Sequence, residues 1–187
     1  KGSWNSFDHE IKDLKGNVIW KFDKAAAEAA YAVAEHVSGN LEAFSSLMNK
    51  TAKELGCTNS NFVNSHGLHD KNHYTTPEDM AGIVREAMKN ELCRKVLSTY
   101  QYTTASTPQH PEGIPLTSTL FSHMYGTEPE GSDILGGKTG FVNESGYCIA
   151  SFGQSDSGTN YVCVTLKGAG LWPTVYDQIK LYTKYAK

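Results

Sequence analysis

The chain has 187 residues and a formal net charge of −3, with 39% hydrophobic and 11% aromatic residues. This length and composition indicate one domain over residues 1–187 with a substantial apolar core. The lack of a basic excess argues against a nucleic-acid partner, and no apolar run reaches the roughly 18 residues that a transmembrane segment needs. We recognise no signal peptide, so no location follows from targeting.

The first part of the chain predicts a hairpin followed by helices. Residues 10–14 and 17–22 flank Lys15-Gly16 and have the pattern of a β-hairpin, so residues 1–24 are treated as an N-terminal hairpin segment. Helices are expected over residues 24–37, 41–55 and 77–89. The third helix has the clearest start, because Thr76 suits an N-cap and a proline follows it.

The second part of the chain predicts an antiparallel sheet. A short helix, a strand, a loop and another short helix are expected over residues 91–97, 99–104, 106–113 and 117–125. Three β-like runs separated by turns then form a meander over residues 134–142, 147–152 and 161–166. A closing helix covers residues 172–185. We expect an α+β fold in which residues 17–22 join the meander in one antiparallel sheet flanked by helices.

The stretch Gly137-Lys138-Thr139-Gly140, on the first strand of this meander, is the candidate binding site. An extended peptide can pair with the backbone groups of a strand edge. Gly140 has no side chain, so a ligand backbone can come close. Lys138 offers a cation for a carboxylate, and Thr139 offers a hydroxyl donor. Taken alone, the same residues also suit an ordinary strand with a solvated lysine.

Further stretches suggest a family. They are Ala34-Glu35-His36-Val37-Ser38-Gly39, Phe62-Val63-Asn64-Ser65-His66-Gly67-Leu68, Gly137-Lys138-Thr139-Gly140-Phe141 and Ser145-Gly146-Tyr147-Cys148. Together they resemble the D-alanyl-D-alanine carboxypeptidases, the low-molecular-mass penicillin-binding proteins of peptidase family S11. The resemblance covers about residues 29–166, and it implies a β-lactamase/transpeptidase-like fold in truncated form.

The resemblance implies a serine-type reaction on peptidoglycan stem peptides that end in D-Ala-D-Ala. In the family, a serine in Ser-x-x-Lys attacks the peptide, and a Ser-x-Asn motif helps to move protons. Lys138, Thr139 and Gly140 would bind the substrate, and the backbone N–H of Phe141 would form half of the oxyanion hole. The resemblance also implies an extracytoplasmic location and no cofactor or metal.

The sequence departs from this family at two of its three motifs. No serine has a lysine three residues later, so the nucleophile motif is absent, and β-lactams would react only if a nucleophile were supplied. Ser38-Gly39-Asn40 fits Ser-x-Asn as a string but falls where the family has a turn between helices, so we interpret it as a cap and turn. The position of the motif itself is occupied by Ala25-Ala26-Ala27. The family's long segment after the first hairpin also has no counterpart.

Two readings of the function therefore stay open. The first is a part or reduced form of a D-Ala-D-Ala carboxypeptidase, inactive alone, whose missing residues come from elsewhere. The second is a pseudoenzyme that binds peptidoglycan peptides or a protein partner without acyl transfer.

Two smaller clusters have alternative readings. His66, His69, Asp70 and His73 could ligate zinc, but we favour hydrogen bonds that order their loop. Cys148 and Cys163 lie on consecutive predicted strands, roughly opposite each other. They would be either a cross-strand disulfide or two small buried thiols, and we favour the thiols.

Overall fold

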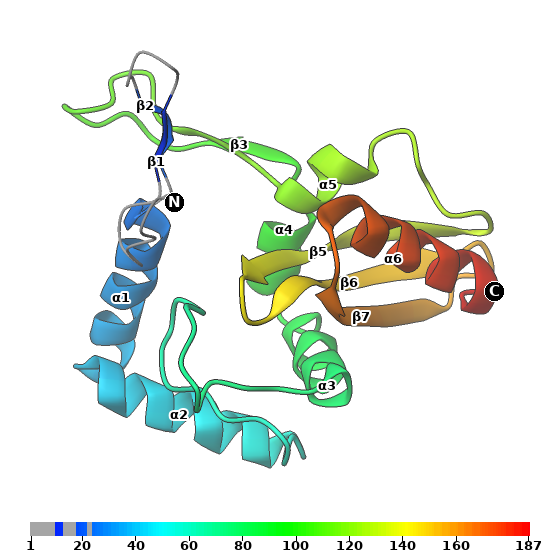
Figure 1. The fold of residues 1–187 in the computed structure, drawn as a ribbon, viewed down its shortest axis with the longest axis horizontal. Coiled ribbons are helices and arrows are strands. Elements are labelled where there is room, and N and C mark those ends of the chain that lie inside the picture. Colours follow the sequence, from blue (N-terminus) through cyan, green and yellow to red (C-terminus); the bar gives the residue numbers. More distant parts are fainter. Residues whose placement is uncertain (1–9, 13–17, 22–23) are drawn as a thin grey trace. The chain divides into compact units, whose positions relative to one another are not determined.

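The structure, a computed structural model, describes residues 10–12, 18–21 and 24–187 (Figure 1). Its contacts divide the chain into two compact units. The first comprises Lys1–Asn49 and Phe62–His73, and the second comprises Lys50–Asn61 and Tyr74–Lys187. A single domain over residues 1–187 stays a prediction.

The first unit begins with a two-stranded hairpin. β1 (Glu10–Lys12) pairs antiparallel with β2 (Val18–Lys21), as the alternating pattern predicts. The expectation that residues 17–22 join the main sheet is wrong: among the described residues β2 pairs with β1 alone, and the main sheet has the order β5-β6-β7. A sequence pattern predicts a strand, but it does not tell which strand will be its neighbour.

Two helices follow the hairpin, α1 (Lys24–Ser38) and α2 (Leu41–Glu54), the last residues of α2 belonging to the second unit. Gly39 has φ of 78°, a left-handed conformation that suits glycine, and its N–H donates to the Glu35 carbonyl at 2.7 Å. The Asn40 side chain accepts from the N–H of Ala43 at 2.8 Å. These contacts confirm that Ser38-Gly39-Asn40 is a cap and a turn.

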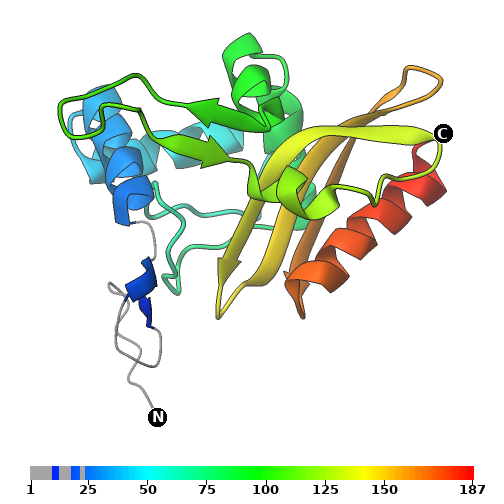
Figure 2. The same ribbon diagram turned by 90° about the horizontal axis from the view of Figure 1, so that it is seen from above.

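The second unit is organised around a three-stranded antiparallel meander. Its strands are β5 (Ser132–Val142), β6 (Gly146–Ser155) and β7 (Asn160–Gly168). Helix α6 (Leu171–Tyr185) lies along the sheet (Figure 2). The core combines Ile149 of β6 and Val175 of α6 with Leu120 and Met124. The expected α+β fold, an antiparallel sheet flanked by helices, is confirmed.

A polar cluster is enclosed between β6 and α6. The Ser151 hydroxyl, the Gln178 side chain and the Tyr182 ring are all fully or almost fully buried. The Gln178 amide nitrogen donates to the Ile149 carbonyl at 3.3 Å and to the Thr165 hydroxyl at 3.0 Å. Because buried polar groups are costly unless they are paired, these contacts favour a single position of α6 against the sheet.

The remaining elements lie before the meander. They are α3 (Pro77–Ala87), α4 (Glu91–Ser98), β3 (Gln101–Thr103), β4 (Pro115–Thr117) and α5 (Thr119–Met124). Helix α3 starts as predicted: the Thr76 hydroxyl accepts from the N–H of Asp79 at 3.2 Å, and Pro77 is the first helical residue. β3 and β4 form an antiparallel ribbon in which Tyr102 lies opposite Leu116.

The two cysteines of the meander are not opposite each other. Cys163 of β7 pairs with Ser151, three residues from Cys148 along β6, and both cysteines are free. The pairs Gly153–Tyr161 and Gln154–Asn160 place the centre of the β6–β7 turn at residue 157, which is later than the midpoint between the two cysteines, so the cysteines cannot face each other. The disulfide alternative is therefore wrong. The favoured free thiols are confirmed, but both cysteines are half-buried and not buried as expected. Burial raises the pKa of the Cys163 thiol to about 11, so it stays protonated at neutral pH.

Candidate functional site

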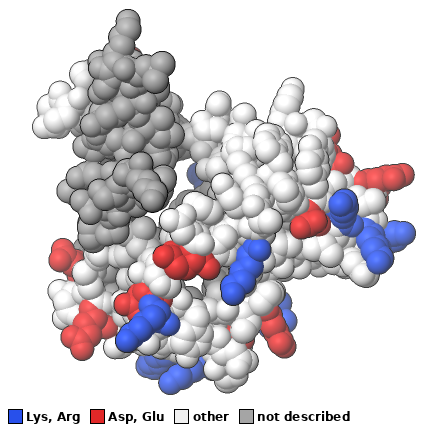
Figure 3. Space-filling view, viewed as in Figure 1, with Lys and Arg blue, Asp and Glu red and all other residues white. Residues whose placement is uncertain are grey.

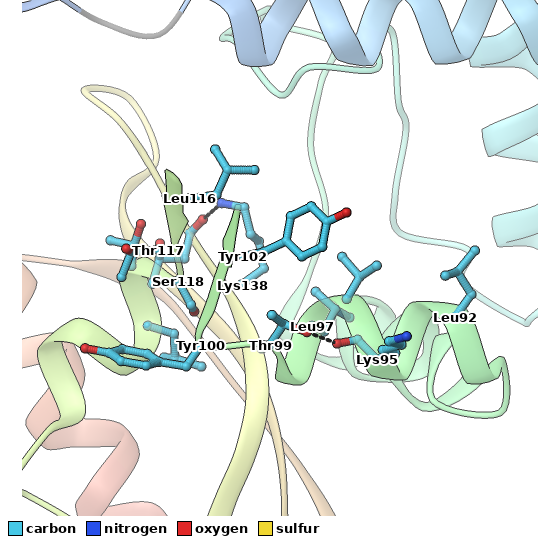
Figure 4. A pocket seen from close by; sticks show the side chains of 15 residues that line it. Leu92, Lys95, Leu97, Thr99, Tyr100, Tyr102, Leu116, Thr117, Ser118 and Lys138 are labelled. Carbon is cyan, nitrogen blue, oxygen red and sulfur yellow. Dashed lines mark hydrogen bonds between the residues drawn. The ribbon is translucent and has the colours of Figure 1, made fainter. Parts of the chain in front are cut away.

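The candidate site is a groove along the outer edge of β5. This strand pairs with β6 on one side and, within the described part of the chain, with no strand on the other. Next to the free edge lies a cavity of about 600 Å³, bounded by β5 at Gly137, Lys138 and Thr139, by α4, by the β3–β4 ribbon and by the start of α5 (Figure 4). Of the three binding residues predicted from the sequence, Lys138 and Thr139 line this cavity, whereas Gly140 is not among its lining residues.

Lys138 is the basic group on the strand wall of this cavity. Its side chain is exposed, and its ammonium group donates to the carbonyl of Thr139. Desolvation of the ammonium group in the groove lowers the pKa of Lys138 from its ordinary value. A carboxylate entering the groove would therefore meet a cation that is held near the strand.

The glycines of β5 differ in what they permit. A methyl group at Gly136 would lie 2.5 Å from the Phe152 ring and 2.6 Å from the Leu97 carbonyl oxygen, and one at Gly137 would collide with the backbone of β6. At Gly140, by contrast, nothing lies within 4 Å of such a group. Gly136 and Gly137 are thus needed for packing, and Gly140 leaves open space where a ligand was predicted to approach.

The opposite wall adds hydroxyl groups that sequence reasoning missed. Ser118 precedes α5, and its hydroxyl does not cap that helix. Its N–H donates to the Tyr100 carbonyl at 2.8 Å, which joins the ribbon to α5. Ser118 and Thr119 line the cavity together with Lys138. No motif marks these two residues, since only the fold brings them next to β5.

Apart from Lys95, helix α4 lines the cavity with apolar residues. None of the residues of α4 is buried against the described part of the chain, and Leu92 and Val96 are among its most exposed apolar side chains. Tyr102 and Leu116 continue this surface on the ribbon. The cavity therefore has a polar side at β5 and α5 and a mainly apolar side at α4 and the ribbon, to which Lys95 and Thr117 also contribute.

The histidine-rich loop belongs to the first unit and is ordered by hydrogen bonds, as favoured from the sequence. His66 Nδ1 accepts from the N–H of Leu68 at 3.1 Å, and His66 Nε2 bonds to the Tyr31 hydroxyl at 2.6 Å. His73 Nδ1 accepts from the N–H of Val63 at 3.2 Å. Burial lowers the pKa of both His66 and His73. Among the described residues, no His, Cys, Asp or Glu cluster is arranged to hold a metal ion.

The charge and the hydropathy of the described residues indicate few other candidate functional sites. On the face drawn in Figure 3, acidic and basic side chains are interspersed and most of the described surface is uncharged. In the part of the chain that the structure describes, no helix is both long and apolar enough to cross a membrane.

Comparison with known proteins relates this chain and its fold to one family. The model of the peptidase S11 family, described as D-alanyl-D-alanine carboxypeptidase, matches residues 10–169. The D-alanyl-D-alanine carboxypeptidase DacF of Bacillus subtilis is 34% identical over 138 residues, which are 74% of this chain and 33% of DacF. DacA of Haemophilus influenzae is 28% identical, over 83% of this chain and 36% of DacA.

Solved structures agree with this assignment. The Streptomyces K15 DD-transpeptidase superposes with a TM-score of 0.65 at 26% identity, over 84% of this chain and 62% of the transpeptidase. Penicillin-binding protein 5 of Haemophilus influenzae gives a TM-score of 0.67 at 24% identity, over 83% of this chain and 43% of that protein. The chain thus has the fold of penicillin-binding proteins, while it spans about a third of the length of the two curated relatives.

Proposed function

Because this chain belongs to the D-alanyl-D-alanine carboxypeptidase family, we propose that its β5 groove binds peptidoglycan stem peptides that end in D-Ala-D-Ala. The observation that carries this proposal is the free edge of β5 with Lys138 beside it. A peptide in extended form adds to such an edge through its backbone. Its terminal carboxylate then replaces the Thr139 carbonyl as the acceptor of the hydrogen bond from the Lys138 ammonium group.

The β5 backbone supports a role for Phe141 as well. The Thr139 carbonyl accepts from the lysine side chain, which indicates that this carbonyl faces the free edge. In an antiparallel strand the N–H and C=O of one residue point the same way, and the direction repeats every second residue. The N–H of Phe141 then also faces this free edge, where it would be a donor for the carbonyl of a peptide paired with β5.

Binding without cleavage is the expected behaviour of this chain alone. The sequence has no Ser-x-x-Lys, and an acyl-enzyme cannot form without an activated hydroxyl. In this proposal the chain holds the stem peptide, reacts with β-lactams only when a nucleophile is supplied, and works outside the cytoplasm, where peptidoglycan is found. A pseudoenzyme that binds the peptide as its final role is the alternative.

The test is a calorimetric titration with an N-acetylated tripeptide ending in D-Ala-D-Ala. We expect binding, weaker binding of the L-Ala-L-Ala peptide, and a loss of affinity of at least about tenfold in Lys138→Ala, since a charge-assisted contact contributes roughly 1.5–3 kcal/mol. Lys180→Ala, which removes an exposed lysine from α6, is the matched control. Equal affinity of the wild-type chain and Lys138→Ala for the D-Ala-D-Ala peptide would show that this lysine is not part of the site, and it would refute the proposal.

A further inference from the structure

A second cavity lies on the face of the β5–β6–β7 sheet that is turned away from α6. Side chains alternate along a strand, and Ser151 of β6 bonds to Gln178 of α6, so Phe152 points to the other face. On that face α3 packs on β6 and β7, next to a cavity of about 800 Å³, which we name the α3 cavity. Small-molecule sites have volumes of roughly 300–1,000 Å³. All residues that line the α3 cavity belong to the second unit.

The sheet gives the α3 cavity an apolar floor. Phe152 of β6 and Val162 of β7 are cross-strand partners, so their side chains lie on the same face of the sheet. Leu135 of β5 adds an apolar side chain that is 43% exposed, and Met88 lines the cavity from the end of α3. This floor suits the apolar or aromatic part of a ligand.

Three basic residues line the same cavity near the C-terminal end of α3. Arg85 and Lys89 are four residues apart, so both lie on one face of the chain's helical path. Arg94 of α4 donates to the carbonyl of the α3 C-cap residue at 3.3 Å, which places it at the same end. The charge of Arg85 acts inside the cavity: burial and the Asp79 carboxylate raise the pKa of the Cys57 thiol in the cavity wall, and Arg85 opposes this rise.

The positive charge of Arg85 is not neutralised by its neighbours. Lys89 bonds to Glu86 at 2.6 Å, whereas the Arg85 guanidinium makes no hydrogen bond or ion pair with any described residue. Of the two carboxylates that line the cavity, Asp79 is buried and accepts two hydrogen bonds from the preceding loop. Glu78 lies seven residues before Arg85, which is about 10 Å along the helix axis. The cavity therefore presents an unpaired cation beside an apolar floor.

We propose that the α3 cavity binds an organic phosphate, namely a phosphate monoester carried on an apolar or aromatic body. Such a group has a charge of about −1.5 to −2 at pH 7, which matches Arg85 and Arg94 better than the single charge of a carboxylate. Guanidinium groups bind phosphate oxygens through paired hydrogen bonds, while the body of the ligand lies on Phe152 and Leu135. The two cavities share no lining residue, so this site is independent of the function proposed for the β5 groove.

Calorimetric titration of the full chain with phenyl phosphate, inorganic phosphate and benzoate tests this site. We expect phenyl phosphate to bind at least about tenfold more tightly than inorganic phosphate, which lacks the apolar body, and than benzoate, which lacks the second charge. Arg85→Gln should weaken phenyl phosphate at least about tenfold, because it removes a charge-assisted contact. Arg85 is exposed, so this variant should keep the thermal stability of the wild-type chain. Lys180→Gln, which removes an exposed cation of α6, is the control.

A vesicle experiment distinguishes a soluble phosphate from a lipid head group. Cosedimentation with phosphatidylcholine vesicles that contain phosphatidic acid, absent with pure phosphatidylcholine and lost in Arg85→Gln, would assign a lipid phosphate. Binding of phenyl phosphate without binding of these vesicles would assign a soluble ligand.

Three results would overturn the proposal. The first is an equal affinity of Arg85→Gln and Lys180→Gln for phenyl phosphate. The second is a loss of phenyl phosphate binding in Lys138→Ala, because the anion would then occupy the β5 groove. The third is binding of benzoate as tightly as phenyl phosphate, which would show that the cavity does not select a phosphate.

Discussion

The Ser151 hydroxyl donates a 2.6 Å hydrogen bond to the side-chain oxygen of Gln178, and both residues are completely buried between β6 and α6. The Tyr182 hydroxyl lies 3.1 Å from the same serine. This cluster connects the sheet that carries Lys138 to its covering helix. Desolvation raises the pKa of Tyr182, so its hydroxyl stays protonated and available as a donor.

Replacement of Gln178 by methionine should strongly destabilise the protein. The change keeps the length of the side chain but leaves the Ser151 hydroxyl, the Ile149 carbonyl and the Thr165 hydroxyl with fewer partners. Because each unpaired buried group costs about 1–3 kcal/mol, we expect a loss of roughly 2–4 kcal/mol in urea unfolding. Gln154→Met, on the exposed part of β6, should cost less than about 0.5 kcal/mol. Similar losses in both variants would contradict the role of the cluster.

Substitutions at two glycines of β5 should have different effects, one on stability and the other on peptide binding. Gly136→Ala should lower stability by about 1–3 kcal/mol, because its methyl group meets the Phe152 ring and the Leu97 carbonyl. Gly140→Ala, with free space around it, should keep or slightly raise stability yet weaken the D-Ala-D-Ala tripeptide. Thermal unfolding and calorimetry measure the two effects. A tripeptide affinity that Gly140→Ala leaves unaltered would show that the ligand does not approach the strand there.

The stability of the first unit should fall in mild acid. Burial lowers the pKa of His66 and His73 in the folded state below the value of about 6.5 for a free histidine. The unfolded chain therefore binds more protons between the folded pKa and pH 6.5, and stability is fully present above that range and is lost as the pH falls through it. Protonation of His73 also removes the acceptor of the Val63 N–H.

The measurement is urea unfolding at pH 7.5 and at pH 5.5. The stability of the first unit is followed separately, for example through the exchange of its amide protons. His73→Asn is the informative variant, because an asparagine oxygen can accept from the Val63 N–H but does not titrate. We expect a smaller loss of stability in acid for this variant than for the wild-type chain. A pH dependence of the wild-type chain that His73→Asn leaves intact would assign the effect to other groups.

The chain alone should form no covalent complex with benzylpenicillin. Acylation needs an activated hydroxyl, and no serine of this sequence has a lysine three residues later. Intact-mass measurement with excess antibiotic should return the unmodified mass. Penicillin-binding protein 5 of Haemophilus influenzae is the positive control. A single adduct on the chain would disprove its inactivity, and peptide mapping would then locate the reacting hydroxyl.

Local sequence patterns predicted most elements of the fold. The N-cap at Thr76, the left-handed Gly39 and the alternating runs of the meander lie where expected, because each depends on interactions between residues close in the chain. The patterns failed where distant segments meet. The hairpin of β1 and β2 forms a separate sheet, and the register between β6 and β7 puts Cys163 opposite Ser151 and not opposite Cys148.

For the candidate site too, local sequence patterns predicted one part and the packing of distant segments determined the other. The sequence by itself determined the chemistry of one wall, Lys138 and Thr139 on a strand with Gly140, and the absence of the nucleophile motif. Only the tertiary structure decided what lies across the groove: the hydroxyls of Ser118 and Thr119 and the exposed apolar side chains of α4 and the ribbon. Backbone propensities and capping act over a few residues, whereas a groove arises from packing between segments that the sequence places far apart.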